Sequence, residues 1–408
     1  MKRRVGIAGG GAAGLGAASY AARSGAEVTI IEKNDCLGKK LSMTGNGRCN
    51  LTNLDLKSEY YNPSARRRMD GWIERYGAVD AIDFFRSLGV ITRSEDGYIY
   101  PVSGQAQTVV NALKNELKRL GVTVIYKEQV KSIRREGDCY IIKTSESETE
   151  VDSCIISTGS LSGVKSTLST GDGYYICSQL GMNIKDTYPA LVGFKCAQDE
   201  IMPAQGVRCD CRVTFYLGKE VIATERGEVQ LTKDTVSGIP VMQASRDIIQ
   251  YVKNEGAVTA ELDFFPDYGD KEFADLKEDM MALSDERSLS EFLLGFSNSN
   301  INEMILGRMK LSGDMKMKNI HRSMINCILD NYRALKIKLL SDSGYAASQV
   351  TKGGVSLGDI TDDMSYKNDP GIFVTGELLD VDGRCGGYNL QWAWCSGKLA
   401  GVAAAGQK

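Results

Sequence analysis

The chain has 408 residues, 42% of them hydrophobic and 25% charged, a composition typical of a globular protein with two or three packed units. Its 49 basic and 52 acidic residues give a net charge of -3, which excludes nucleic-acid or membrane binding driven by overall charge. The eleven cysteines form no CxxC pair and the single histidine, His321, lies in a helical context, so we expect reduced thiols and no metal site.

The start of the chain lacks the apolar region of a signal peptide, and no run of about eighteen apolar residues occurs. We therefore expect a cytoplasmic protein without a membrane span. No pattern in the sequence predicts its oligomeric state.

The first predicted elements form a strand, a turn, a helix and a second strand. Glycines in the pattern GxGxxG separate the first strand from a helix predicted over residues 12–22, and the second strand, 28–31, ends on an acid. In such a unit the glycines allow a tight turn, the approach of a pyrophosphate and close packing, and the acid accepts from ribose hydroxyls. The residues expected to bind a dinucleotide here are Gly9, Gly11, Ala12, Ala13, Gly14, Glu32 and Lys33.

The segment LSMTGNGRCNLTN, residues 41–53, follows without strand or helix periodicity. Its glycines would bring backbone N–H groups close to cofactor oxygens, its arginine would offset pyrophosphate charge, and its asparagines would supply neutral donors. A polar turn with a purely conformational role is the alternative. The candidate cofactor residues in and just before this segment are Lys40, Leu41, Thr44, Gly45, Arg48, Cys49 and Asn50.

Alternating strands are predicted between residues 121 and 157, with Val130 where such folds contact adenine and a strand that ends on Thr158 and Gly159. No second GxGxxG with a following acid occurs, so we expect any NAD(P)H to dock only transiently. Residues 188–266 and 336–342 are mostly strand-like, and 267–335 are helical with short polar breaks.

Near the end of the chain, a strand over 372–375 is followed by Gly376 and Glu377, a glycine-rich loop and a helix that begins near Tyr388. In flavoenzymes of the glutathione-reductase type, a strand ending in Gly-Asp binds the ribityl chain and the next helix points its N-terminus at the flavin. This segment resembles that motif, with Glu replacing Asp. The cofactor residues expected here are Gly376, Glu377, Gly387, Tyr388, Asn389 and Leu390.

Five segments together resemble the BaiN/YhiN family of bacterial NAD(P)/FAD-dependent oxidoreductases: GKKLSMTGNGRCNLTN, STGDGYYICSQLGMNI, GEVQLTKDTVSGIPVMQAS, QVTKGGVSLGDI and GIFVTGELLDVDGRCGGYNLQWAWCSGKLAG. The resemblance implies an α/β fold, in which a Rossmann-like FAD-binding domain of the glutathione-reductase type is interrupted by a β-barrel-like insert and a small helical insert. We predict the FAD domain at 1–187 and 343–408, the β-rich insert at 188–266 and 336–342, and the helical insert at 267–335. Lys352 departs from a position that is usually small in the family, which puts the substrate in doubt more than the cofactor.

The resemblance implies an FAD enzyme fed by NAD(P)H that reduces an activated C=C bond in a small apolar enone, with a steroid-like 3-dehydro bile acid as the specific expectation. Oxidation of aminoacetone and reduction of ribosomal uridine to dihydrouridine are the alternatives. An RNA substrate would require a basic groove, for which the candidates are Arg66, Arg67, Arg68, Lys310, Lys316 and Lys318. Tyr388 and Arg48 are the candidate proton donors, and Cys49 is a candidate for a flavin adduct or a redox disulfide.

Overall fold

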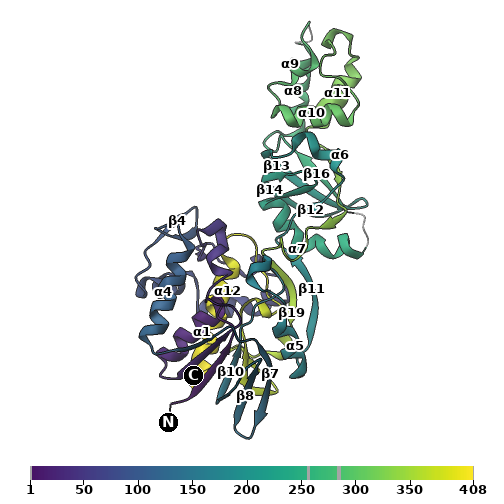
Figure 1. The fold of residues 1–408 in the computed structure, drawn as a ribbon. Helices are drawn as coiled ribbons and strands as arrows, with labels where there is room; N and C mark the ends of the chain where they lie inside the picture. Colours follow the sequence, from purple (N-terminus) through teal and green to yellow (C-terminus); the bar gives the residue numbers. More distant parts are fainter. Residues whose placement is uncertain (1, 255–257, 283–285, 408) are drawn as a thin grey trace. The chain divides into compact units, whose positions relative to one another are not determined.

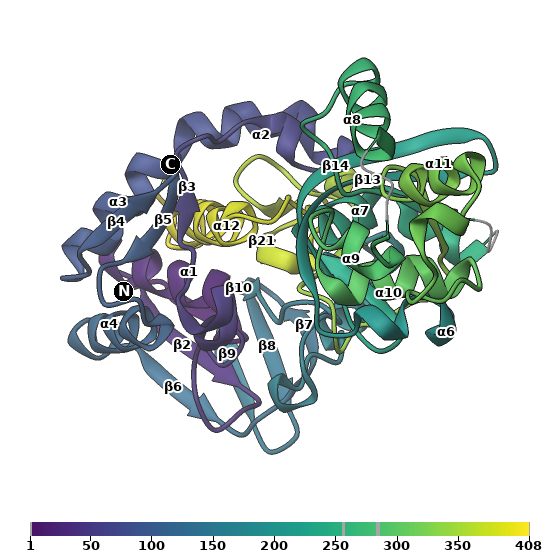
Figure 2. The same cartoon turned by 90° about the horizontal axis from the view of Figure 1, so that it is seen from above.

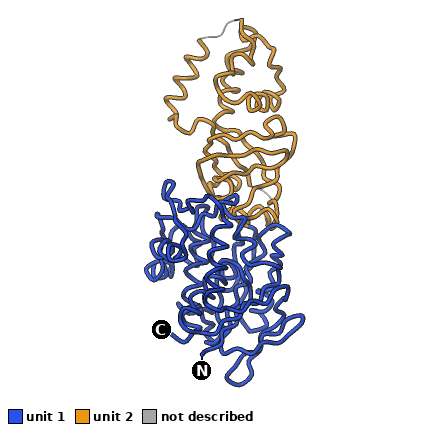
Figure 3. The backbone as a smooth tube through the Cα atoms, turned by 60° about the vertical axis from the view of Figure 1, so that its left-hand side comes forward, with its two compact units in different colours: residues 1–189, 349–408 blue, residues 190–348 orange. Residues whose placement is uncertain are grey.

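The computed structural model describes residues 2–254, 258–282 and 286–407. The chain forms two compact units (Figure 3). Unit 1 comprises Met1–Pro189 and Gln349–Lys408, and unit 2 comprises Ala190–Ser348. Unit 1 therefore contains both ends of the chain, and unit 2 is an insertion within its sequence (Figure 1).

Unit 1 is built on a six-stranded sheet in which the paired neighbours β1, β2, β6, β10 and β21 run parallel and β20 is an antiparallel edge. In spatial order the strands are β20 (Ser365–Tyr366), β21 (Asp369–Val374), β10 (Ser153–Ile156), β1 (Arg4–Ala8), β2 (Glu27–Glu32) and β6 (Thr123–Tyr126). The central strands are continuous apolar runs because both faces of a parallel sheet are covered.

Two long helices, α1 (Ala12–Arg23) and α12 (Tyr388–Ala404), pack together on one side of this sheet (Figures 1 and 2). A three-stranded antiparallel sheet packs against β1 from the other side, where a Cβ on Gly6 would lie 2.4 Å from Ile142 Cδ1. Its strands are β7 (Val130–Glu136), β8 (Cys139–Thr144) and β9 (Glu148–Val151).

The other elements of unit 1 surround this core. The helices are α2 (Pro63–Arg75), α3 (Ala78–Ser87), α4 (Ala106–Arg119) and α5 (Asp172–Gln179). The strands are β3 (Thr52–Asn53), β4 (Thr92–Glu95) and β5 (Tyr98–Pro101) in one small sheet, and β11 (Ile184–Ala190) and β19 (Val350–Val355) in another. The 3-10 turns are η1 (Leu41–Gly47), η2 (Ser58–Tyr60), η3 (Lys165–Thr167), η6 (Leu357–Asp359) and η7 (Gly376–Leu378).

The predicted Rossmann-type fold is confirmed, and the strand–helix–strand unit at the start of the chain lies within one residue of its predicted bounds. The segment 41–53 differs from the expected irregular loop, because it contains η1 and β3. Gly45 and Asn46 have φ of +56° and +53° and interrupt η1, so no helical periodicity marks it in the sequence.

Unit 2 contains a seven-stranded sheet with the order β17-β16-β13-β14-β15-β12-β18, in which the paired neighbours run antiparallel. The strands are β12 (Phe194–Lys195), β13 (Arg208–Leu217), β14 (Glu220–Leu231), β15 (Thr235–Gly238), β16 (Val258–Asp263), β17 (Leu335–Lys338) and β18 (Ser341–Asp342). The helices are α6 (Gln198–Ile201), α7 (Ile239–Asn254), α8 (Asp270–Ala282), α9 (Leu289–Leu293), α10 (Ser299–Arg308) and α11 (Arg322–Asp330), with 3-10 turns η4 (Met202–Ala204) and η5 (Met317–Asn319). Since the sheet and the helices form one compact unit, the separation of 267–335 as a domain of its own stays a prediction.

Candidate functional site

A tight glycine turn joins β1 to α1. Gly9 has a φ of +103°, and a Cβ on Gly14 would lie 2.1 Å from Gly9 O, so both positions require glycine. Gly11 differs, because a Cβ there would meet no atom within 4 Å and the backbone conformation is extended. The turn is therefore tightly packed on its inner side and open at Gly11, where a pyrophosphate would approach.

The helix that follows this turn begins without a cap. Among the residues that the structure describes, no side chain caps the start of α1, and its first turn contains no acidic residue. Ala13 is only 7% exposed and Gly14 is buried, so the end of the helix is partly enclosed. Enclosed N–H groups at a helix start need an acceptor, and an anion is the acceptor that the helix dipole favours.

Glu32 lies at the end of β2 and faces the same turn. Its Oε2 accepts from Gly10 N at 2.7 Å, and its Oε1 accepts from Asn34 N at 2.7 Å and from Asn34 Nδ2 at 2.8 Å. A carboxylate offers about four acceptor positions, so a place remains for one ribose hydroxyl. Glu128 N donates to Glu32 O, which brings the start of β7 at Val130 close to this end of β2.

Lys33, the next residue, is engaged in the protein. Its ammonium group donates to Asp172 Oδ2 at 2.6 Å and to Thr170 Oγ1 at 2.9 Å. The structure therefore places this predicted cofactor residue in an ion pair beside Glu32.

The N-terminus of α12 is a second uncapped helix start. Gly387 is its N-cap with a φ of +95°. No side chain in the described part of the chain caps this end, and no acidic residue lies in its first turn. Tyr388 is 7% exposed and Gln391 is 1% exposed, so this helix start is also largely enclosed. The predicted cofactor residues Gly387, Tyr388, Asn389 and Leu390 form this turn.

The two helices run in the same direction and are held close by glycine. A Cβ on Gly397 would lie 2.6 Å from Ala13 O, and one on Gly401 would lie 2.4 Å from Ala17 O. These contacts place residue 396 of α12 level with the start of α1. Because α12 begins at Tyr388, its N-terminus extends about eight residues beyond the start of α1, or roughly 12 Å at the rise of an α-helix. The two electropositive helix ends are therefore separated along their common axis. An extended cofactor, with its pyrophosphate at one point and its ring at another, would require such a separation.

Two buried hydroxyl groups lie at the carboxyl ends of neighbouring strands. Thr158 follows β10 and Thr375 follows β21, and neither Oγ1 has a hydrogen-bond partner among the described residues. Ligands of open α/β sheets bind at the carboxyl ends of the strands, and buried hydroxyls need partners. Gly159, with a φ of +73° and open space at its Cβ position, adjoins the first of them.

Glu377 joins three segments beside the second hydroxyl. Its Oε2 pairs with Lys40 Nζ at 2.7 Å, and its Oε1 accepts from Ser160 Oγ at 2.6 Å and from Thr351 N at 3.0 Å. Gly376 has a φ of +67°, and a Cβ there would lie 2.8 Å from Ala13 Cβ. The predicted pair Gly376 and Glu377 thus lies next to the start of α1, and Lys40 reaches it.

The side chain of Arg48 has a different partner from the predicted pyrophosphate. It donates to both carboxylate oxygens of Glu95 at 2.7 Å and lies 4.3 Å from the centre of the Tyr100 ring. The strands β4 and β5 bring these groups to it, which no local pattern in the sequence indicates. Three other predicted residues of this segment lie in η1, where Leu41 is buried, Thr44 Oγ1 donates to Leu41 O, and Gly45 has a positive φ.

Two further residues have predicted roles in the reaction. Cys49 is 0% exposed and burial raises the pKa of its thiol to about 12, which disfavours the reactive thiolate, and a flavin adduct or redox disulfide at this residue stays a prediction. The hydroxyl of Tyr388 donates to Asp55 O at 3.2 Å, and burial raises its pKa well above the usual range. Both Tyr388 and Arg48 thus have partners within the protein, and their role as proton donors stays a prediction.

Residues 50–53 contact the first turns of α12 and the glycine turn before it. This contact was not predicted from the sequence. Thr52 Oγ1 donates to Gln391 Oε1 at 2.6 Å, Asn53 Nδ2 donates to Gly386 O at 3.0 Å, and Trp394 Nε1 donates to Leu51 O at 3.0 Å. With its amide oriented to satisfy its neighbours, Asn50 accepts from Gly387 N at 3.2 Å. Asn50 and Asn53 therefore hydrogen-bond to the glycine turn before α12, which lies far from them in the sequence.

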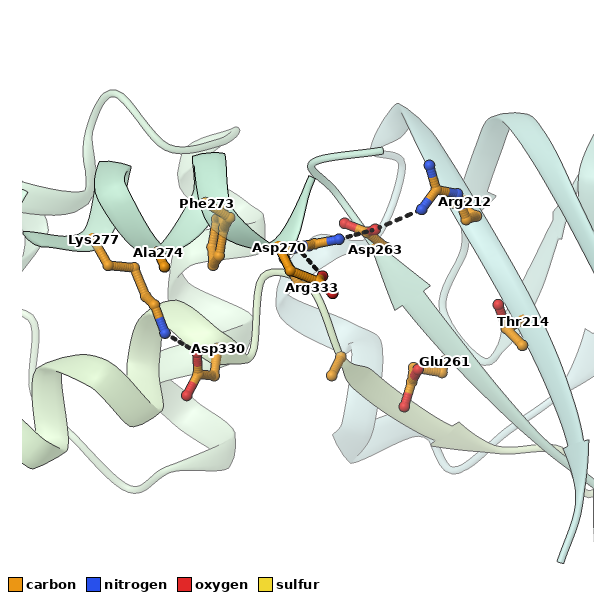
Figure 4. Close-up of a pocket in the computed structure, with 11 residues that line it drawn as sticks. Arg212, Thr214, Glu261, Asp263, Asp270, Phe273, Ala274, Lys277, Asp330 and Arg333 are labelled. Carbon is orange, nitrogen blue, oxygen red and sulfur yellow. Dashed lines mark hydrogen bonds and ion pairs between the residues drawn. The ribbon is translucent and has the colours of Figure 1, made fainter. Parts of the chain in front are cut away.

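Unit 2 carries a charged cavity of about 480 Å³ between its sheet and helices (Figure 4). Arg212 and Arg333 both approach Asp263, and Lys277 pairs with Asp330, so the cations that line it face carboxylates. None of the predicted cofactor residues lines this cavity. Within the described residues, no cluster of His, Cys, Asp and Glu could hold a metal, and no helix is long and apolar enough to span a membrane.

Comparison with known families matches residues 3–403 to the HI0933-like protein Rossmann domain. The chain belongs to the HI0933-like family. The predicted membership of the BaiN/YhiN type is thereby confirmed over nearly the whole chain.

Among curated relatives, the 3-dehydro-bile acid delta(4,6)-reductase of Clostridium scindens is 34% identical over 405 residues, which are 98% of this chain and 99% of the reductase. The ribosomal RNA dihydrouridine synthase of Haemophilus influenzae is 27% identical over 96% of this chain and 95% of its own. These relatives confirm the predicted enzyme class, an oxidoreductase.

Among solved structures, the 3-ketosteroid-delta4-(5alpha)-dehydrogenase of Rhodococcus jostii RHA1 has a TM-score of 0.56 and covers 99% of this chain and 97% of its own. Its sequence is 14% identical, so the likeness concerns the fold. The likeness agrees with the Rossmann-type fold that the family match and the parallel sheet show.

Proposed function

We propose that this HI0933-like protein is an FAD-dependent reductase that uses NAD(P)H to saturate an activated C=C bond in a small apolar enone. A steroid-like 3-dehydro bile acid is the proposed substrate. The single observation that carries the proposal is the 34% identity with the bile acid reductase along 98% of the chain. Identity of this extent includes both units, so it covers the parts outside the nucleotide-binding fold as well.

The described residues fit FAD as the group bound in unit 1. The open position at Gly11 and the first N–H groups of α1 would hold the pyrophosphate, and Glu32 would accept from the ribose. The part of FAD between the pyrophosphate and the flavin would lie near Thr158, Thr375 and the Glu377 carboxylate. The start of α12 would face the flavin. When bound, a flavin supplies hydride transfer between the nicotinamide and the C=C bond.

The start of α12 contributes an electrostatic effect of its own. Its N–H groups carry the positive end of the helix dipole, which favours negative charge near them. A buried position strengthens this effect because water does not screen it. The contribution of this helix end to the reaction would therefore be to stabilise the negative charge of the reduced flavin near the start of α12.

Reduction of uridine in ribosomal RNA is the second candidate, because the dihydrouridine synthase is 27% identical over nearly the whole chain. Charge favours the first candidate. The helical residues 267–335 contain nine Lys and Arg against twelve Asp and Glu. Two candidates for the basic groove form ion pairs, Arg68 with Asp362 and Lys318 with Glu286. Their positive charge is therefore offset locally.

Anaerobic turnover separates these candidates. We expect the FAD-loaded protein with NADH or NADPH to convert a 3-dehydro bile acid with a conjugated double bond into a product that carries two more hydrogen atoms, detected by mass spectrometry. The same acid with its ring already saturated is the matched control and should stay unchanged. Dihydrouridine formed in an rRNA transcript, or peroxide formed from aminoacetone in air, without conversion of the enone would overturn the proposal.

A further inference from the structure

The glycine turn before α12 is fastened by a distant part of the chain. We call this part the clasp, which consists of Asn50, Leu51, Thr52 and Asn53. The clasp makes four hydrogen bonds to residues 386–394. The contact is close, since a Cβ on Gly387 would lie 2.6 Å from Thr52 C. The clasp thus contacts the part of α12 whose N–H groups have no capping side chain.

These contacts are buried and polar. Thr52 is 0% exposed, Asn53 is 4% exposed and Gln391 is 1% exposed. By contrast, the contact between α1 and α12 includes close packing of small residues, such as Ala13 against Gly397. Apolar packing fills space but sets direction weakly, whereas hydrogen bonds fix the orientation of the groups that they join. Polar contacts concentrated at one end of the helix therefore point to a need for precise orientation at that end.

We propose that the clasp is a positioning device, in which Asn53 and Thr52 fix the direction of the first N–H groups of α12 and so set how strongly this helix end stabilises reduced flavin. The proposal rests on the proposed binding of FAD in unit 1. The clasp residues act through the turn and the helix.

The backbone directions show how the clasp would act. Gly386 O is held by Asn53 and Gly387 N by Asn50, so both sides of the peptide unit between these residues are fixed. The next three amides, of Tyr388, Asn389 and Leu390, precede the first intrahelical bond, which Gln391 N makes to Gly387 O. A rotation of the turn would turn these three amides away from a common direction.

Two variants test the proposal in the full-length, FAD-loaded protein. Thr52→Val keeps the shape of the side chain and removes the hydroxyl that Gln391 accepts from. Asn53→Asp replaces the donor to Gly386 O by a carboxylate that repels it. Thr52→Ser is the conservative variant that should restore the unaltered behaviour. Asn302→Asp is a matched control, because Asn302 is another buried amide, 6% exposed and bound to Leu293 O and Tyr332, in unit 2.

Two readouts are needed. Hydrogen exchange followed by mass spectrometry should show about tenfold faster exchange at residues 387–390 in Thr52→Val and Asn53→Asp, with the second half of α12 unchanged. The flavin midpoint potential should fall, because the reduced, negatively charged form loses stabilisation. A tenfold loss corresponds to about 30 mV for a two-electron couple. Neither readout should change in Asn302→Asp.

Faster exchange with an unchanged potential in both variants would overturn the proposal, and so would an unchanged exchange rate. If Asn53→Asp fails to fold, Thr52→Val and Thr52→Ser still provide the comparison. A protein that binds no flavin in any form would instead overturn the proposed function, and with it this proposal. That failure is recognised separately, because hydrogen exchange in the flavin-free protein still reports whether the clasp orders the turn.

Discussion

Gly11→Val is expected to weaken FAD binding at least a hundredfold while the protein stays folded. A Cβ at Gly11 would meet no protein atom within 4 Å, and the extended backbone there suits any residue, so the substitution strains nothing in the fold. The new side chain would instead fill the position that a pyrophosphate must approach. A hundredfold change in dissociation constant is about 3 kcal/mol, which fluorescence titration of the flavin-free protein with FAD measures readily.

Gly71→Val provides the matched control. Gly71 also has open space at its Cβ position but lies on α2, outside the proposed site. FAD affinity should be unchanged in this variant. Equal FAD affinity in Gly11→Val and the unaltered protein would remove the β1–α1 turn from the cofactor site.

Gly397→Val is expected to destabilise unit 1 by about 1 to 3 kcal/mol, the typical cost of overpacking a well-packed contact. Its Cβ would lie 2.6 Å from Ala13 O and 3.1 Å from Ala17 N. These are backbone atoms of a neighbouring helix, which cannot move aside as a flexible side chain can. The expected result is a lower urea midpoint for unfolding of the flavin-free protein, with weaker FAD retention because both helix starts shift.

Gly16→Ala is a second substitution in the α1–α12 interface, and here we expect a small increase in stability. Gly16 lies on α1 in the same interface, but a Cβ there would be 3.8 Å from Trp394, an ordinary contact distance. Alanine in a helix interior is more stable than glycine by about 0.5 to 1 kcal/mol, so this variant should be slightly more stable than the unaltered protein. If both variants proved neutral, the close packing of α1 and α12 described here would be incorrect.

The nucleotide-binding unit was predictable because its signal is local. Gly9, Gly11, Gly14 and Glu32 fall within one strand–helix–strand unit, and each has a fixed position in that unit. The start of α12 was predictable for the same reason, since strand, glycine turn and helix follow one another directly. In both places the structure differs from the predicted bounds by only a few residues.

The partners of polar side chains were not predictable, because they come from distant parts of the chain. Arg48 pairs with Glu95, which the small sheet of β3, β4 and β5 brings to it. Asn53 and Gly386 are separated by 333 positions, and no local pattern in either segment predicts that they are in contact. A sequence rich in Gly and Asn indicates backbone turns and neutral donors, and only the fold decides which groups those donors meet.

We expect one FAD in this chain to pass electrons from NAD(P)H to an enone, and anaerobic stopped-flow spectroscopy with two successive mixings follows both half-reactions. The first mixing, with NADH or NADPH, should bleach the visible absorption of the bound flavin. The second, with a 3-dehydro bile acid that carries a conjugated double bond, should restore that absorption at a rate equal to or faster than turnover. A flavin that no nicotinamide bleaches, or whose absorption returns only when oxygen is admitted, would contradict the account.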